Sequence, residues 1–183
     1  MTTTLETERL LLRPFTMGDR DDLHHILSDP QVTATLLDVP EPFTLSDAAD
    51  WIRYAQDGAV NGSLYAFAMV AKHDAVLLGW IDLEIDSEHR RGDMAYWLGQ
   101  PYWGRGFASE AARRMVRFGF ETLDLNRISA QCIASNIASA RVMQKAGMRY
   151  EAALRHGTRK GEQFYDLHIY GMTRADYGEE HGT

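Results

Sequence analysis

The segment YWGRGFASEA, at residues 102–111, constrains the fold more than any other part of the chain. It follows a strand-like stretch at 90–99 and precedes a periodicity that predicts a helix over 108–122. The first turn of a helix carries unpaired backbone N–H groups and the positive end of the helix dipole. Gly104 and Gly106 allow a sharp turn and a close approach of the backbone to a ligand. The loop is therefore typical of a site for an anion such as phosphate.

The same glycines are compatible with other interpretations. An ordinary turn between a strand and a helix would use them equally well. A P-loop is excluded because no Gly-Lys-Ser/Thr closes the segment. A dinucleotide fingerprint is disfavoured, since Ser109 stands in place of the third glycine and the loop follows the third strand of a meander.

The rest of the chain indicates one domain over residues 1–183, because this length with 45% hydrophobic residues suits a single core. Capping patterns begin the first two helices at Thr16 and Thr44, and we expect Pro30, Gly58 and Gly147 to end helices. The order of elements predicts a mixed α/β sheet. The expected strands are 8–15, 63–71, 75–86, 90–99, 126–134, 148–156 and 163–173, and the expected helices are 19–29, 48–58, 108–122 and 136–146.

Composition narrows the classes of partner and compartment. The net charge of −7 argues against nonspecific binding to nucleic acid. No apolar stretch is long enough to cross a bilayer, and the first residues lack the features of a signal peptide, so we expect a cytoplasmic protein without a membrane partner. Cys132, the single cysteine, is expected to be a buried thiol. The histidines show no metal-binding spacing, and we expect no metal.

Four segments together resemble the GNAT acetyltransferases of the RimJ/RimL type: LETERLLLRPF, YWLGQPYWGRGFASEA, NRISAQCIASNIASARVMQKAGM and FYDLHIYGM. The resemblance spans nearly the whole chain. It implies a GNAT fold, with a mixed and mostly antiparallel sheet flanked by helices. It also implies acetyl-coenzyme A as donor and direct attack by a primary amine, such as a protein amino terminus. One departure is Pro101, which stands where the family usually has Gln or Arg.

The resemblance assigns residues to the cofactor. Backbone groups of Tyr96, Trp97 and Leu98 would face the pantetheine arm and the acetyl carbonyl, where strands of the family separate; their side chains could equally be core packing. The pyrophosphate would lie on the loop and the first helical turn, at Gly104, Arg105, Gly106, Phe107, Ala108 and Ser109.

A second group of residues lies on the helix that follows Cys132. Without the family, Asn136 is a helix cap and Ser139 a surface residue. The resemblance implies instead that Asn136 contacts the cofactor arm and that Ser139 donates a proton to the leaving thiolate. Arg141 and Lys145 would reach the cofactor phosphates, unless they are solvated like most exposed basic residues.

The segment GWIDLEID supplies candidates for the general base, because a protonated amine must lose a proton before it attacks. Its alternation places Asp82, Glu84 and Asp86 on one face of a strand, which is either solvent or the acceptor cleft. We predict that Glu84 is the base.

Two alternatives remain at this stage. The chain could bind acetyl-coenzyme A without turnover, as a sensor or interaction module. As an enzyme it could acetylate a small amine, such as a polyamine, an amino acid or an antibiotic, and fold-level similarity does not choose among these. A homodimer is one assembly compatible with the resemblance.

Overall fold

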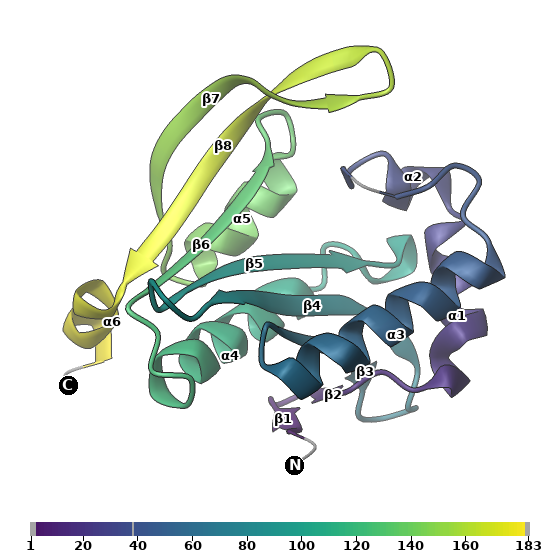
Figure 1. Cartoon of the computed structure of the whole chain (residues 1–183), viewed down its shortest axis with the longest axis horizontal. Helices are drawn as coiled ribbons and strands as arrows, with labels where there is room; N and C mark the ends of the chain where they lie inside the picture. The colour runs from purple at the N-terminus through teal and green to yellow at the C-terminus, as the bar shows by residue number, and fades with distance from the viewer. Residues whose placement is uncertain (1–2, 38, 182–183) are drawn as a thin grey trace.

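A computed structural model describes residues 3–37 and 39–181 of the chain (Figure 1). Its centre is an eight-stranded sheet of order β1-β2-β3-β4-β5-β6-β8-β7. All strand pairs are antiparallel except β5 with β6, so the sheet is mixed and mostly antiparallel, as predicted. The strands are β1 (Leu5–Glu6), β2 (Leu10–Arg13), β3 (Leu64–Ala71), β4 (Leu77–Asp86), β5 (Arg91–Leu98), β6 (Arg127–Ile133), β7 (Arg149–Lys160) and β8 (Gln163–Thr173).

Helices cover both faces of the sheet (Figure 1). α3 lies over the front face in this view, with α1 and α2 at its side, while α4 lies behind the strands. α6 follows β8 at the carboxyl end. The α-helices are α1 (Arg20–Leu27), α2 (Pro30–Thr33), α3 (Leu45–Asn61), α4 (Phe107–Glu121), α5 (Ile137–Lys145) and α6 (Arg174–His181), and short 3-10 turns cover Met17–Asp19 and Gln100–Tyr102.

The alternation of strand side chains divides the core into two layers. Ile81 and Leu83 of β4 belong to the cluster under α4 and α5, which also contains Met115 and Phe118. Trp80, the residue before Ile81, belongs to the cluster under α1 and α3. Successive strand residues point to opposite faces, so one strand supplies both layers. The polar positions of β4 therefore face the side of α3.

The parallel pair β5 and β6 is short. Its register includes only Arg91, Gly92 and Asp93 of β5. Beyond Asp93 the two strands separate, while β5 stays paired with β4 as far as Leu98. The centre of the sheet therefore opens into a gap between β5 and β6, and this gap positions the candidate site.

The helix boundaries near Gly58 and Pro30 differ from the sequence expectations. Gly58 does not end a helix: α3 continues to Asn61, and Gly62 caps it with a left-handed φ of 76°. A Cβ at Gly58 would lie 2.5 Å from the Cβ of Leu64, so that glycine serves close packing of helix and strand. Pro30 separates α1 from α2, occupying the first helical turn of α2, where its missing N–H costs nothing.

Of the two predicted strands at the carboxyl end of the chain, β7 is longer than expected and β8 has the expected bounds. β7 extends to Lys160, because RHGTRKG continues the hairpin with β8 through a shift in register. Near the tip, the Lys160 ammonium donates hydrogen bonds to the carbonyl oxygens of Thr33 and Leu36, the latter at 3.0 Å. This contact ties the hairpin to α2 and the segment after it.

Candidate active site

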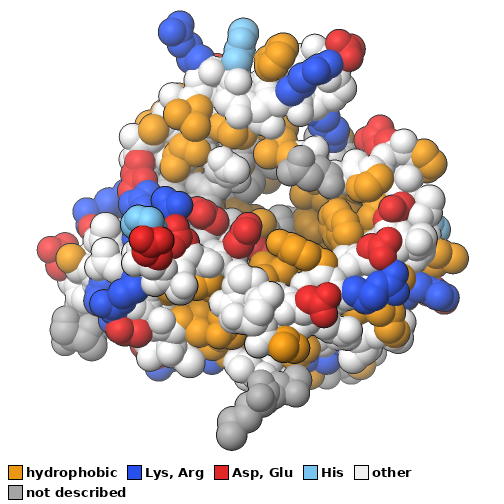
Figure 2. All heavy atoms as spheres, viewed as in Figure 1, with side chains coloured by type: hydrophobic (Ala, Val, Ile, Leu, Met, Phe, Trp, Pro, Cys, Tyr) orange, Lys and Arg blue, Asp and Glu red, His pale blue; other side chains and the backbone are white. Residues whose placement is uncertain are grey.

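A cavity of about 890 Å³ passes through the gap between β5 and β6. Residues on both faces of the sheet line this cavity, so it extends from the side of α3 to the side of α4 and α5. Figure 2 shows a hollow on the face that carries α3, bordered by acidic and hydrophobic side chains. On the α4 and α5 side the lining includes Gly104, Ala108, Asn136, Ser139 and Val142; on the α3 side it includes Trp51, Tyr54, Trp80, Asp82, Glu84 and Asp93.

The strand end that sequence analysis assigned to the cofactor arm lies along the gap. Tyr96, Trp97 and Leu98 all line the cavity and have no partner on β6 in the described pairing. The edge of β5 is thus available to a ligand over these residues, with one exception. The carbonyl oxygen of Leu98 accepts a 2.8 Å hydrogen bond from the Trp103 indole. That carbonyl is already occupied.

The glycine loop has the backbone conformation that its sequence requires. Gly104 and Gly106 adopt left-handed φ values of 71° and 83°, and Gly106 is the N-cap of α4. Gly104 and Ala108 line the cavity. The side chains of Phe107 and Ser109 are buried toward the core, so only their backbone groups could reach a ligand. The geometry suits anion binding by main-chain N–H groups at the start of a helix.

Arg9, a residue that sequence reasoning missed, holds this loop. Its guanidinium lies 4.5 Å from the ring centroid of Phe107 and donates a 3.0 Å hydrogen bond to the carbonyl oxygen of Arg105. It also pairs with Glu110 of α4 at 2.7 Å. Arg105 also packs over the Phe107 ring, 5.1 Å from its centroid, so two cations contact one aromatic ring. No local pattern signals these contacts, because Arg9 and Arg105 are 96 positions apart.

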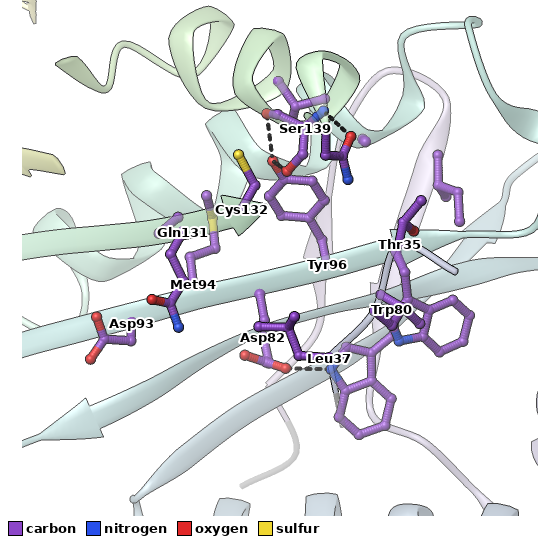
Figure 3. Close-up of a pocket in the computed structure, with 18 of the residues that line it drawn as sticks. Thr35, Leu37, Trp80, Asp82, Asp93, Met94, Tyr96, Gln131, Cys132 and Ser139 are labelled. Carbon is purple, nitrogen blue, oxygen red and sulfur yellow. Dashed lines mark hydrogen bonds between the residues drawn. The ribbon is translucent and has the colours of Figure 1, made fainter. Parts of the chain in front are cut away.

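Two hydroxyl groups meet across the α5 side of the gap (Figure 3). The Tyr96 hydroxyl donates a hydrogen bond to the Ser139 carbonyl oxygen and lies 2.9 Å from Ser139 Oγ. Burial strongly raises the pKa of Tyr96, so this phenol keeps its proton at neutral pH. The side chain of Asn136 accepts a 3.0 Å hydrogen bond from the Ser139 backbone and caps α5. The capping role of Asn136 is therefore present, and its side chain also borders the cavity.

Cys132 is buried, as expected, and lines the same side of the cavity. Burial raises the pKa of its thiol, which disfavours the nucleophilic thiolate. Figure 3 shows Cys132 on β6 beside the pair formed by Tyr96 and Ser139.

Three carboxylates lie on the opposite side, facing α3. Asp82, Glu84 and Asp93 line the cavity, and Glu84 stands directly across from Asp93 in the pairing of β4 with β5. Asp93 accepts a hydrogen bond from the Ser129 hydroxyl on β6. Asp86, grouped with them by the alternation, instead pairs with His89 at the end of β4 and does not border the cavity in the described lining.

Asp82 differs from its neighbours by its environment. Its carboxylate accepts a 2.5 Å hydrogen bond from the Trp80 indole N–H. The pKa of Asp82 is raised to about 7, mainly by burial and to a smaller extent by the charge of Glu84, while hydrogen bonds from Trp80 and the Ala95 backbone oppose the rise. Glu84 is exposed by comparison. Alternation in the sequence could not distinguish the two.

The two basic residues that were predicted to reach the cofactor phosphates lie outside the cavity. Arg141 and Lys145 are exposed on α5 and do not border it. Among the described residues that line the cavity there is no Lys, Arg or His. Over residues 3–37 and 39–181, no group of three or more His, Cys, Asp or Glu side chains could hold a metal, and no helix could span a bilayer.

Comparison with known proteins identifies a family. The model of the acetyltransferase (GNAT) domain matches residues 9–149. An uncharacterized N-acetyltransferase, p20 of Bacillus licheniformis, is 33% identical over 176 residues, covering 95% of this chain and 98% of that protein.

Solved structures agree with this match. A GNAT-family acetyltransferase from Bacillus anthracis has a TM-score of 0.83 and 26% identity, covering 94% of this chain and 99% of the other. RimL, a ribosomal L7/L12 alpha-N-protein acetyltransferase in complex with coenzyme A, has a TM-score of 0.85 at 16% identity, covering 93% and 98%; at that identity it supports the fold alone.

Proposed function

The chain belongs to the GNAT acetyltransferase family, and we propose that it acetylates a primary amine that enters the cavity as a cation from the side of α3. Acetyl-coenzyme A is the acetyl donor of this family. The observation that carries the choice of acceptor is the charge of the cavity. Three carboxylates and no basic side chain occur among the described lining residues. A protonated amine is attracted to such a site, and an anion is repelled.

The opposite side suits the donor. The main chain of the loop from Gly104 to Ser109 would bind the pyrophosphate, and the free edge of β5 at Tyr96 and Trp97 would bind the pantetheine arm. The bound donor supplies a thioester carbonyl that the amine attacks. A backbone donor fixed at that edge would stabilise the negative charge that develops on its oxygen. Ser139, together with Tyr96, would protonate the leaving sulfur.

Two features of the site suit acetyl-coenzyme A: the cavity between β5 and β6, and the main-chain groups along it that have no hydrogen-bond partner in the sheet. The separation of β5 from β6 leaves main-chain groups without sheet partners, and such groups require hydrogen bonds from a ligand or water. The first turn of α4 supplies more of them. Arg141 and Lys145, exposed outside the cavity, would contact only the phosphates of the donor.

The acceptor is a protein amino terminus or a small cationic amine. A sequence relative that is 28% identical over 134 residues, YdaF of Bacillus subtilis, is named a putative ribosomal N-acetyltransferase, and this name supports the first class. The hollow beside α3 is lined by Trp51, Tyr54 and Trp80, which would contact the apolar part of either acceptor.

A thiol-release assay with acetyl-coenzyme A tests the proposal. The panel contains peptides with free amino termini, the same peptides with blocked amino termini, polyamines, amino acids and aminoglycosides. Release with at least one free amine, and none with its blocked form, is the expected result. Coenzyme A binding without release from any amine would favour a sensor or interaction module instead.

A further inference from the structure

Asp82 lines the cavity on the side of α3, where we propose that the acceptor amine enters. It lies on β4 opposite Ala95 of β5, one position before Tyr96. Tyr96 points to the other face of the sheet, toward Ser139, while Asp82 lies below it near Trp80 (Figure 3). The hydroxyl pair and the carboxylate thus border the same cavity from opposite faces. A reaction within the gap would have a proton donor on one face and a proton acceptor on the other.

We infer that Asp82, and not Glu84, takes the proton from the acceptor ammonium, and that Glu84 acts through Asp82. This inference rests on the proposed function. It replaces the sequence prediction of Glu84 as the base with a division of roles between two acids on one strand.

Burial and orientation favour Asp82. Its carboxylate is held by the Trp80 indole at 2.5 Å, whereas Glu84 has no hydrogen bond or ion pair among the described residues. A base must be held in one orientation to accept a proton at a defined place. Trp80 is itself fixed in the core, stacked on Phe15 with ring centroids 4.5 Å apart.

The charges around Asp82 favour proton uptake near neutral pH. The groups that face it are Glu84 on the same strand, Asp93 on β5 and Tyr54 on α3, whose phenol pKa is raised by burial and by both Glu84 and Asp82. No described Lys, Arg or His lines the cavity to neutralise them. The pKa of Asp82, about 7, suits a general base that works at neutral pH.

Glu84 has an electrostatic role in this proposal and does not take the proton itself. It stands directly across from Asp93, and like charges placed opposite each other on neighbouring strands repel. Its negative charge raises the pKa of Asp82. Glu84 therefore makes Asp82 a stronger base and attracts the cation, without contacting the reacting nitrogen.

The proton balance of the step is complete. Asp82 removes one proton from the ammonium, giving the neutral amine. The nitrogen lone pair forms the bond to the acetyl carbon, and the bond from that carbon to sulfur breaks. The hydroxyl pair of Ser139 and Tyr96 gives one proton to the thiolate. The nitrogen then loses a second proton to become the amide, and that proton restores the hydroxyl pair. Asp82 finally releases its proton to water.

The pH profile of kcat/KM tests this assignment. Wild-type activity should fall on the acidic side with a midpoint near the pKa of Asp82. Asp82→Asn should lower kcat/KM at pH 7 by about 100-fold or more and abolish that midpoint. Glu84→Gln should keep most of the activity and move the midpoint to lower pH. Asp86→Asn is the matched control, a carboxylate on the same strand outside the cavity, and should leave the profile unchanged.

A second measurement does not depend on turnover. The indole N–H resonance of Trp80 should titrate with pH in the wild-type protein, with its midpoint near 7, and should not titrate in Asp82→Asn. Trp80→Phe identifies that resonance among those of the four tryptophans. Bound coenzyme A must still raise the melting temperature of Asp82→Asn, which shows that the variant is folded and binds the donor.

The outcomes separate the two proposals. An acidic midpoint that persists in Asp82→Asn, or that disappears in Glu84→Gln instead, overturns the role of Asp82 and leaves the proposed function standing. A wild-type protein that releases no thiol with any amine overturns both.

Discussion

The Tyr96 hydroxyl donates its proton to the Ser139 carbonyl oxygen at 2.9 Å, and it lies 2.9 Å from the Ser139 hydroxyl. Because the single phenol proton points to the carbonyl oxygen, Ser139 Oγ is the donor toward the phenol oxygen in this arrangement. The two residues come from β5 and α5, which are joined here across the gap. They form one hydrogen-bonded unit, so a change in either residue alters the hydrogen bonding of the other.

The first prediction concerns this pair. Ser139→Ala and Tyr96→Phe should each lower kcat about tenfold or more, because proton donation to the leaving sulfur acts mainly in the transition state. The double variant should be little worse than the worse single variant, since residues of one unit are not additive. Stopped assays at saturating acetyl-coenzyme A measure kcat. Tyr165→Phe, outside the described cavity lining, is the control.

The affinity for coenzyme A decides how these kcat values are interpreted. This affinity should change little in Ser139→Ala and in Tyr96→Phe. Weaker binding of coenzyme A with an intact kcat would assign Ser139 to the cofactor pocket alone and would contradict the role in proton transfer.

The second prediction concerns the glycine loop. Gly106→Glu should abolish the rise in Tm that coenzyme A causes, because bulk and negative charge would stand against the phosphates. Gly161→Glu is a matched control, since Gly161 also has a positive φ, of 58°, but lies in the turn between β7 and β8. Both substitutions strain the backbone, and only the first should remove ligand stabilisation. Differential scanning fluorimetry with and without coenzyme A measures this. An unchanged shift in folded Gly106→Glu would refute the phosphate site.

Local signals in the sequence account for much of the fold. Glycines, helix caps and apolar periodicity act over a few residues, and they located the loop at Gly104 and Gly106 and the cap at Asn136. The predicted helix end at Gly58 is wrong because a helix interior also uses glycine where a strand packs against it, here at Leu64. The length of a helix then depends on tertiary contacts rather than on the local residue type.

The candidate site was harder to predict at the level of single side chains. Alternation places Asp82 and Glu84 on one face, and this was correct. Which of them is the more buried depends on α3 and on Trp80, and no pattern within the strand contains that information. Arg9 shows the same limit, because its contacts with the loop exist only after β2 pairs with β3 in the sheet.

The third prediction follows from the raised pKa of Asp82. A carboxyl whose pKa is higher in the folded state than in the unfolded state costs stability as the pH rises, because the fold disfavours the charged form. The cost begins above the ordinary value of 3.8 and is complete above about 7. Asp82→Asn should therefore be more stable than wild type at pH 8, with little difference at pH 3.5. Each kcal/mol corresponds to about 2–4 °C of Tm for a domain of this size.

Asp86→Asn gives the opposite sign and serves as the control. The backbone N–H of His89 and other partners lower the pKa of Asp86, so its charge stabilises the fold above its unfolded pKa and this contribution is lost on acidification. Melting curves from pH 3.5 to pH 8 would record both trends. Equal Tm values for wild type and Asp82→Asn at every pH would show that the carboxyl is not perturbed by the fold.

The last prediction concerns the acceptor. The cavity has acidic side chains and no basic ones among its described lining residues, and the whole chain carries a net charge of −7. Peptides with a free amino terminus followed by Lys or Arg should therefore react with higher kcat/KM than acidic peptides of equal length. The advantage should shrink with salt, because the Debye length falls from about 10 Å at 0.1 M to about 3 Å at 1 M. Competition assays at both salt concentrations, with coenzyme A affinity measured in parallel, separate acceptor effects from donor effects. If neutral acceptors react best and salt has no effect on kcat/KM, the acids do not select the acceptor by its charge, and the apolar lining beside α3 must do so instead.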